Sequence, residues 1–446
     1  MTSPRSIAAT RVWSGGSFVP ATVRIDGGEI SAIDVYDPAA DVVLSDELVL
    51  LPGLVDSHVH LDEPGRTEWE GFATGTAAAA AGGVTTLLDM PLNSVPVTTT
   101  VEALAAKREA ARGKLAVDVG YWGGAVPENL GALAALVGAG VVGFKCFLSP
   151  SGIDEFGHLD AEQLEAALRE IAELGSILIV HAEDPEHLHS DGPLGDQYAD
   201  FVASRPPESE REAIRAVIEA SRRTRGRAHI VHVSDGGALD DVRAAKAEGV
   251  PITVETCPHY LTLRAEDVPA GAAAFKCCPP IRDAANQDLL WEGVLDGTID
   301  AIVSDHSPST PALKSSPDFG LSWGGISGLQ TGFSAVWTEA HRRGVPLERL
   351  LPLFTTGPAR IGGLGGRGRL AAGEPAHLVS FAPAAEHTVD AQRLEYRNKL
   401  SPWDGRRLRG VIAATYVHGE LAFTPDGGLS ARGGREILAE PATLAG

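Results

Sequence analysis

The chain has 446 residues, and 37 lysines and arginines against 59 aspartates and glutamates give it a formal net charge of −22. Such a surface repels nucleic-acid backbones and anionic membranes, so neither is an expected partner. The length fits a barrel of alternating strands and helices, which takes about 250 residues, together with a smaller module.

Eight short runs rich in Val, Ile and Leu, each ended by polar residues, predict eight strands. Stretches with helical spacing separate them, and several of these stretches end in glycine, which often terminates a helix. Nearly continuous apolar strands are typical of a parallel sheet covered on both faces. In chain order the runs are 49–60, 84–90, 115–122, 141–148, 176–183, 229–234, 251–259 and 301–307. The pattern predicts an α/β fold, a (β/α)8 TIM barrel.

The two ends of the chain predict a second, smaller domain. Residues 1–50 and 365–446 show short strands with turns, and neither end alone makes a stable sheet. We expect both ends to build one composite β-sandwich domain, with the barrel at 51–364 inserted between them.

Six polar residues each lie at or just past the C-terminal end of a predicted barrel strand, where barrels of this kind carry their active sites. Two of them, His58 and His60, are two positions apart on one strand, so both side chains point to the same face. Pairs of divalent metals lower the pKa of bound water toward about 7 and polarise a substrate. The candidate metal ligands are His58, His60, Lys145, His181, His232 and Asp305.

Lys145 lies in the apolar run GFKCFL. Burial lowers the pKa of a lysine, and the neutral amine can then add carbon dioxide to become a carbamate that bridges two ions. The alternative is a lysine whose stem packs while its ammonium reaches water. Imidazole and carboxylate ligands favour zinc, although iron, cobalt or manganese also fit. Strand alternation turns Cys146 away from the site.

Three further histidines have weaker interpretations. His229 precedes His232 by three positions, which places it on the other face, so it is interpreted as structural. His259 and His306 either support the metal ligands from behind or are plain structural residues.

The cysteines and the hydropathy indicate the compartment. The four cysteines, Cys146, Cys257, Cys277 and Cys278, include no C-x-x-C pair. We therefore expect reduced thiols and a cytoplasmic protein. No stretch approaches the ~20 apolar residues that span a bilayer, and the first residues lack the apolar core of a signal peptide.

With these residues in place, the chain resembles the cyclic amidohydrolases, and the allantoinases more than the dihydroorotases or hydantoinases. The similarity runs over essentially the whole chain and includes GLVDSHVHLDEPGRTEWEGF, DMPLNSVP, GFKCFLSPSG, IVSDHSPS and NKLSPWDGRRLRG. The resemblance implies hydrolysis of the hydantoin ring of allantoin to give allantoate. The alternative is a D-hydantoinase (dihydropyrimidinase) or dihydroorotase activity. A homotetramer is the family expectation.

The resemblance also implies roles for the candidate residues. The first metal takes His58, His60 and Asp305, the second takes His181 and His232, and carboxylated Lys145 and a hydroxide lie between them. Catalytic Asp305 is expected to take the proton of the attacking hydroxide and deliver it to the departing ring nitrogen.

Substrate recognition is expected to come from four positions. The side chains of Asn93 and Ser149 and the backbone around Cys278 and Leu329 would hold the ring amide and the ureido group. Plain structural alternatives are a turn at Asn93 and a cap at Ser149. Residues 310–323 are the candidate for a mobile cover over the pocket.

The chain departs from the patterns of its relatives at three places. Asp62 stands where dihydroorotases place an arginine for the substrate carboxylate and where an allantoinase is expected to have a neutral Asn or Ser. Ser149 and Pro150 occupy the stretch where hydantoinases place a tyrosine. His377 replaces the aspartate of a common Ala-Asp-Leu motif. A second class of function, a non-catalytic scaffold that has lost its metal ligands, is disfavoured because all six ligands are present.

Overall fold

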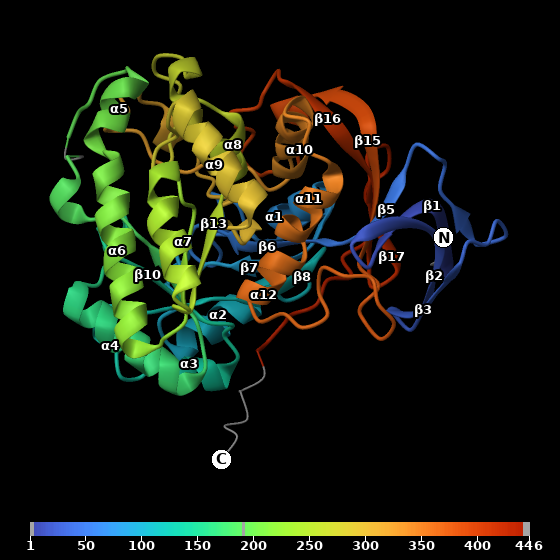
Figure 1. The fold of residues 1–446 in the computed structure, drawn as a ribbon, viewed down its shortest axis with the longest axis horizontal. Coiled ribbons are helices and arrows are strands. Elements are labelled where there is room, and N and C mark those ends of the chain that lie inside the picture. Colours follow the sequence, from blue (N-terminus) through green and yellow to red (C-terminus); the bar gives the residue numbers. More distant parts are fainter. Residues whose placement is uncertain (1–3, 190–191, 440–446) are drawn as a thin grey trace.

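The computed structural model describes residues 4–189 and 192–439, which form a barrel flanked by a β-rich domain (Figure 1). The barrel strands are β6 (Leu54–Val59), β7 (Val84–Asp89), β8 (Asp118–Tyr121), β9 (Gly123–Gly124), β10 (Phe144–Phe147), β11 (Leu178–His181), β12 (Ala228–Ile230), β13 (Ile252–Thr256) and β14 (Ala301–Ile302). Parallel pairing runs through β6–β7–β8 and through β9 to β14. Only Trp122 separates β8 from β9, so these two act as one barrel strand. His60 N donates to His306 O at 2.8 Å and closes the ring. The predicted TIM barrel is confirmed.

Helices cover the outside of the barrel, as Figure 1 shows. They are α1 (Phe72–Ala81), α2 (Val101–Ala111), α3 (Ala134–Ala139), α4 (Ala161–Leu174), α5 (Tyr198–Ser204), α6 (Pro207–Thr224), α7 (Leu239–Ala247), α8 (Pro258–Thr262), α9 (Ala284–Asp296), α10 (Gly332–Arg342), α11 (Leu347–Phe354) and α12 (Thr356–Ile361). Helix α4 shows why the sequence forms them. Asp160 and Gln163 make a capping box at its start, and Gly175 ends it with a φ of 63°. Its apolar face, including Leu164 and Leu168, is buried.

The β-rich domain is built from both ends of the chain, as predicted. Its strands form one hydrogen-bonded sheet of nine strands. They are β1 (Ser6–Ser14), β2 (Ser17–Asp26), β3 (Glu29–Val35), β4 (Val42–Val43), β5 (Val49–Pro52), β15 (Leu378–Thr388), β16 (Arg407–Val417), β17 (Glu420–Thr424) and β18 (Gly428–Leu429). Strand β5 joins the two halves because it pairs with β1 on one side and with β15 on the other.

The first predicted strand, 49–60, is divided between the two domains. Strand β5 belongs to the nine-stranded sheet, and β6 belongs to the barrel. Gly53 separates them, and a Cβ atom there would lie 2.0 Å from Thr85 Oγ1. The end of the described chain also returns to the barrel, where Glu436 bridges to Val119 of β8. The domain limits at residues 50 and 365 stay a prediction.

Two further observations concern the chain as a whole. The four cysteines form no disulfide. Among the described residues, no helix combines the length and the hydropathy needed to cross a membrane.

Candidate active site

The structure brings all six predicted metal ligands to one cavity. They come from β6, β10, β11 and the segments that follow β6, β12 and β14, and they line a cavity of about 340 Å³. None of the six is more than 7% exposed. The barrel therefore gathers residues from five separate strands at its C-terminal end, as the fold predicts.

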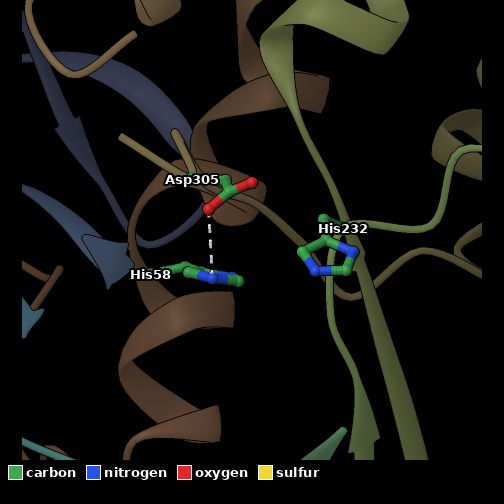
Figure 2. A group of neighbouring side chains, drawn as sticks. All are labelled: His58, His232 and Asp305. Carbon is green, nitrogen blue, oxygen red and sulfur yellow. Dashed lines mark ion pairs between the residues drawn. The ribbon is translucent and has the colours of Figure 1, made fainter. Parts of the chain in front are cut away.

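The donor atoms of the four histidines and Asp305 fall into two neighbouring groups. Asp305 Oδ1 lies 3.2 Å from His58 Nε2 and 3.6 Å from His60 Nε2. His181 Nδ1 lies 3.0 Å from His232 Nε2. The groups are contiguous, because donor atoms of His58, His232 and Asp305 all lie within 4.8 Å of one another (Figure 2).

The hydrogen bonds behind the histidines leave bare nitrogen atoms facing the cavity. His60 Nδ1 lies 2.9 Å from Leu92 O. Because a carbonyl only accepts, Nδ1 carries the proton and Nε2 of the neutral ring has a lone pair. His58 Nδ1 donates in the same way to Glu255 Oε1 at 2.6 Å. Both lone pairs face the carboxylate of Asp305, an arrangement that is repulsive unless a cation lies between them. The donor set therefore fits a divalent metal.

His181 is held by a buried ion pair. Its Nε2 donates to Glu183 Oε2 at 2.8 Å, and Arg205 Nη1 donates to the same oxygen at 2.6 Å. Burial would raise the pKa of Glu183, but the Arg205 guanidinium and the bond from His181 lower that pKa to about 2. Glu183 is therefore a carboxylate that leaves Nδ1 of His181 free for a metal.

Two of the ligands have a backbone conformation that side chains rarely adopt. His232 has a φ of 40° and Asp305 a φ of 41°. Non-glycine residues with positive φ are strained by about 1–3 kcal/mol, and such strain gathers at functional sites. Both side chains line the cavity.

Lys145 is 1% exposed, so its ammonium does not reach bulk water. Its Nζ lies 4.9 Å from the centroid of the Phe147 ring. Burial lowers the pKa of Lys145 to about 8, although the carboxylates of Asp305 and Glu255 act in the opposite direction. A substantial fraction of the amine is therefore neutral near pH 8, as addition of carbon dioxide requires.

The four predicted substrate-binding residues do not all reach the cavity. Asn93 and Cys278 line it. Ser149 is 1% exposed, and its hydroxyl has no hydrogen-bond partner among the described residues. Leu329 lines a separate cavity of about 20 Å³. Contact of these residues with substrate stays a prediction.

Asp62 lies behind the cavity wall. It is 1% exposed, and Asn93 Nδ2 donates to its Oδ1 at 3.4 Å. Burial, followed by the charge of Asp89, raises the pKa of Asp62 well above its usual range. Besides Lys145, two basic side chains, Arg205 and Lys276, line the cavity itself. The electrostatic field in the cavity therefore depends on Arg205 and Lys276 as well as on Asp62.

Sequence reasoning missed the buried groups that hold the ligands. Glu255 accepts from His58 and, through its other oxygen, from His229 Nε2 at 3.0 Å, so His229 also serves the site. Glu183 follows His181 by two residues, and this spacing in the sequence was a signal that could have identified it as the hydrogen-bond partner of His181. His306 Nε2 lies 3.3 Å from Glu70 Oε2.

His259 stands apart from these hydrogen-bonded histidines. Both of its ring nitrogens lack a hydrogen-bond partner among the described residues. Burial lowers its pKa to about 4. It is therefore a neutral ring at pH 7.

Part of the predicted cover forms a wall of the cavity. Gly320, Leu321, Ser322 and Trp323 line it. Lys276 Nζ donates to Ser322 O at 2.6 Å, and Lys314 Nζ donates to Trp323 O at 3.0 Å and to Gly325 O at 2.8 Å. The segment is thus held by two lysines, and its mobility stays a prediction.

Known proteins resemble this chain over almost its whole length. The amidohydrolase family matches residues 49–422. Allantoinase from Streptomyces avermitilis is 51% identical over 441 residues and covers 98% of both chains. Allantoinase from Arabidopsis thaliana is 42% identical, covering 94% of this chain and 87% of its own. Among solved structures, the L-hydantoinase (dihydropyrimidinase) from Arthrobacter aurescens has a TM-score of 0.90 at 28% identity, covering 98% of this chain and all of that one.

Proposed function

Because the chain belongs to the amidohydrolase family, we propose that it is a metal-dependent cyclic amide hydrolase that opens the hydantoin ring of allantoin to give allantoate. The observation that carries the proposal is the set of bare imidazole nitrogens facing Asp305 in the cavity. The substrate is proposed because the 51% identical relative, alike over 98% of both chains, is an allantoinase.

The ligand geometry supports two metal positions. His58, His60 and Asp305 would hold one ion, and His181 and His232 would hold the other. Carboxylated Lys145 would link the two, since a carbamate offers two oxygens at the end of a long side chain. Imidazole and carboxylate ligands suit zinc, and iron, cobalt or manganese would also fit this set. When bound, such a pair lowers the pKa of water toward about 7 and polarises a carbonyl.

Asp305 is the proposed proton carrier. It is the one carboxylate among the described residues that line the cavity. It would take a proton from the attacking water and deliver it to the ring nitrogen as the amide bond breaks, a general base that becomes a general acid. Burial of the surrounding groups strengthens the interactions that orient it.

The cavity fits a small polar substrate, since ligand sites typically occupy about 300–1,000 Å³ and this cavity has about 340 Å³. Asn93 and the backbone near Cys278 would face the ring amide and the ureido group. Ser149 and Leu329 are not among the residues that line the cavity, and their contact with the substrate stays a prediction.

Dihydroorotate is a second candidate substrate because Arg205 and Lys276 line the cavity and would attract its carboxylate. Turnover of allantoin, hydantoin and dihydroorotate by the zinc-loaded protein separates the possibilities. The proposal expects the largest kcat/KM for allantoin and almost no turnover by Asp305→Asn. A larger value for dihydroorotate would replace the proposed substrate while retaining the chemistry.

A homotetramer is also proposed, on the family expectation alone. Sedimentation equilibrium tests it, because one chain has a mass of 46.5 kDa. A species with the mass of one or two chains would contradict it.

A further inference from the structure

In each half of the proposed metal centre, one histidine ligand donates a hydrogen bond to a buried carboxylate, and the two carboxylates have different surroundings. Glu255 stands behind His58. Its Oε1 accepts from His58 Nδ1 at 2.6 Å, and its Oε2 accepts from His229 Nε2 at 3.0 Å. The Glu255 side chain is 2% exposed. In the described part of the chain, no lysine or arginine forms an ion pair with it. Its negative charge is therefore not offset by a salt bridge to a lysine or arginine, and it acts on both His58 and His229.

Glu183 stands behind His181, but it shares its charge with an arginine. Glu183 Oε2 accepts both His181 Nε2, at 2.8 Å, and Arg205 Nη1, at 2.6 Å. The other oxygen of Glu183 has no hydrogen-bond partner among the described residues. The Arg205 guanidinium thus polarises the same oxygen that accepts the hydrogen bond from His181. The Arg205 side chain is only 13% exposed.

These two arrangements have opposite effects on a metal. A carboxylate behind a ligand histidine makes the imidazole more basic and strengthens its bond to the ion. A buried cation in the same network offsets that gain and repels the ion, and burial keeps water from screening it. The half with His58 and His60 also contains the carboxylate of Asp305, whereas His181 and His232 are both neutral ligands.

We infer that the two ions bind with unequal affinity, and that Arg205 keeps the site of His181 and His232 the weaker and more exchangeable one. The inference rests on the proposed binuclear centre. Glu255 and Arg205 are positioning residues, since each acts on a metal through a histidine ligand. A chelator would remove the ion held by His181 and His232 before the other one, which leaves the enzyme with a single ion.

The test is zinc titration of the metal-free full-length protein with bicarbonate present, in competition with a chromogenic chelator. Wild type is expected to show two binding steps whose dissociation constants differ at least about tenfold. Glu255→Gln should weaken the tight step by about 10–100-fold, in line with the loss of groups that support metal ligands. The glutamine can keep the shape of the site, because its amide can donate to His229 if the proton of that ring moves to Nδ1. Thr253 Oγ1 lies 2.8 Å from that nitrogen and can accept it.

The more decisive variant is Arg205→Gln, which should tighten the weak step by about tenfold because the buried positive charge that repels the ion is removed. Arg205→Lys is the matched control, because it keeps the positive charge, and it should leave that step close to wild type. An ordinary loss of structure would weaken binding, so a gain in affinity is a result that a merely structural role does not produce. Thermal melting of the metal-free variants verifies that they are folded.

The outcomes separate the inference from the proposed function. Equal affinities in a wild type that binds two ions and hydrolyses allantoin would overturn the inference alone. Unchanged or weaker zinc binding by folded Arg205→Gln would also overturn the inference. If Arg205→Gln does not fold, Glu255→Gln tests the inference independently. A wild type that binds a single ion or leaves allantoin intact would overturn the proposed function instead.

Discussion

Glu210 on α6 secures the segment that carries His232. Its Oε1 accepts from Ser234 N at 2.9 Å and from Asp235 N at 3.3 Å. Its Oε2 accepts from the Ser234 hydroxyl and from Arg282 Nη2 at 2.7 Å. The side chains of Glu210 and Arg282 are 2% and 4% exposed. One buried carboxylate thus fixes the backbone two residues past a metal ligand whose φ is 40°.

We predict that Glu210→Gln lowers the free energy of unfolding by about 3–5 kcal/mol, the usual effect of breaking a buried ion pair. An amide has one acceptor oxygen, so it cannot serve both Arg282 and the backbone N–H groups of Ser234 and Asp235. An unpaired buried N–H group costs about 1–3 kcal/mol. This cost is not added to the loss of about 3–5 kcal/mol, because both losses belong to one network. The strained segment at His232 should relax, and kcat should fall with it.

Urea unfolding followed by circular dichroism, together with kcat, measures both effects. Glu208→Gln is the matched control, since Glu208 is an exposed residue of the same helix. Its free energy of unfolding should stay within about 0.5 kcal/mol of wild type. A change of less than about 1 kcal/mol in Glu210→Gln would refute the view that this network holds the segment.

Three further predictions concern other parts of the molecule. In buffers held at one fixed concentration of dissolved carbon dioxide, reactivation of metal-free protein by zinc should accelerate about tenfold per pH unit up to about pH 8 and then level off, because only the neutral amine reacts and burial lowers the pKa of Lys145 to about 8. A flat profile under these conditions would contradict carboxylation. At pH 7, Asp118→Asn should destabilise the protein by about 3–5 kcal/mol, as urea unfolding would show. Hydrogen bonds from His377 and His418 outweigh the effect of burial and lower the pKa of Asp118. The contribution of Asp118 to the free energy of unfolding is therefore present above about pH 4 and is lost as the pH falls. A difference in stability between wild type and Asp118→Asn that grows in acid would contradict this reasoning. Lys314→Met should raise KM, since the cavity wall loses donors to three carbonyls; steady-state kinetics with an unchanged KM would exclude this role.

The sequence was sufficient for the barrel and for the positions of the six candidate ligands. Strand alternation places His58 and His60 on one face, and the fold places every strand end at the same edge. The other four candidates each follow an apolar run, so the same rule brings them to the cavity. The local sequence pattern predicts the barrel and the ligand positions because the same pattern is repeated at each strand.

The groups that hold the ligands could not be predicted in this way. Glu255 meets His58 across 197 positions of the chain, and Arg205 meets Glu183 across 22. Such pairs depend on side-chain direction and on which strands become neighbours, and neither leaves a periodic signal. The division of the first strand at Gly53 was also hidden, because the close approach of Thr85, which leaves no room for a Cβ atom there, gives no local signal in the sequence.

The central claim is that a lysine converted to a carbamate links two metal ions in the cavity. Anomalous diffraction from crystals of the zinc- and bicarbonate-loaded protein tests it directly. The account predicts two zinc peaks, one beside His58, His60 and Asp305 and one beside His181 and His232, with density for a carboxylate on Lys145 between them. A single peak, or an unmodified amine at Lys145 in active crystals with both peaks, would contradict it.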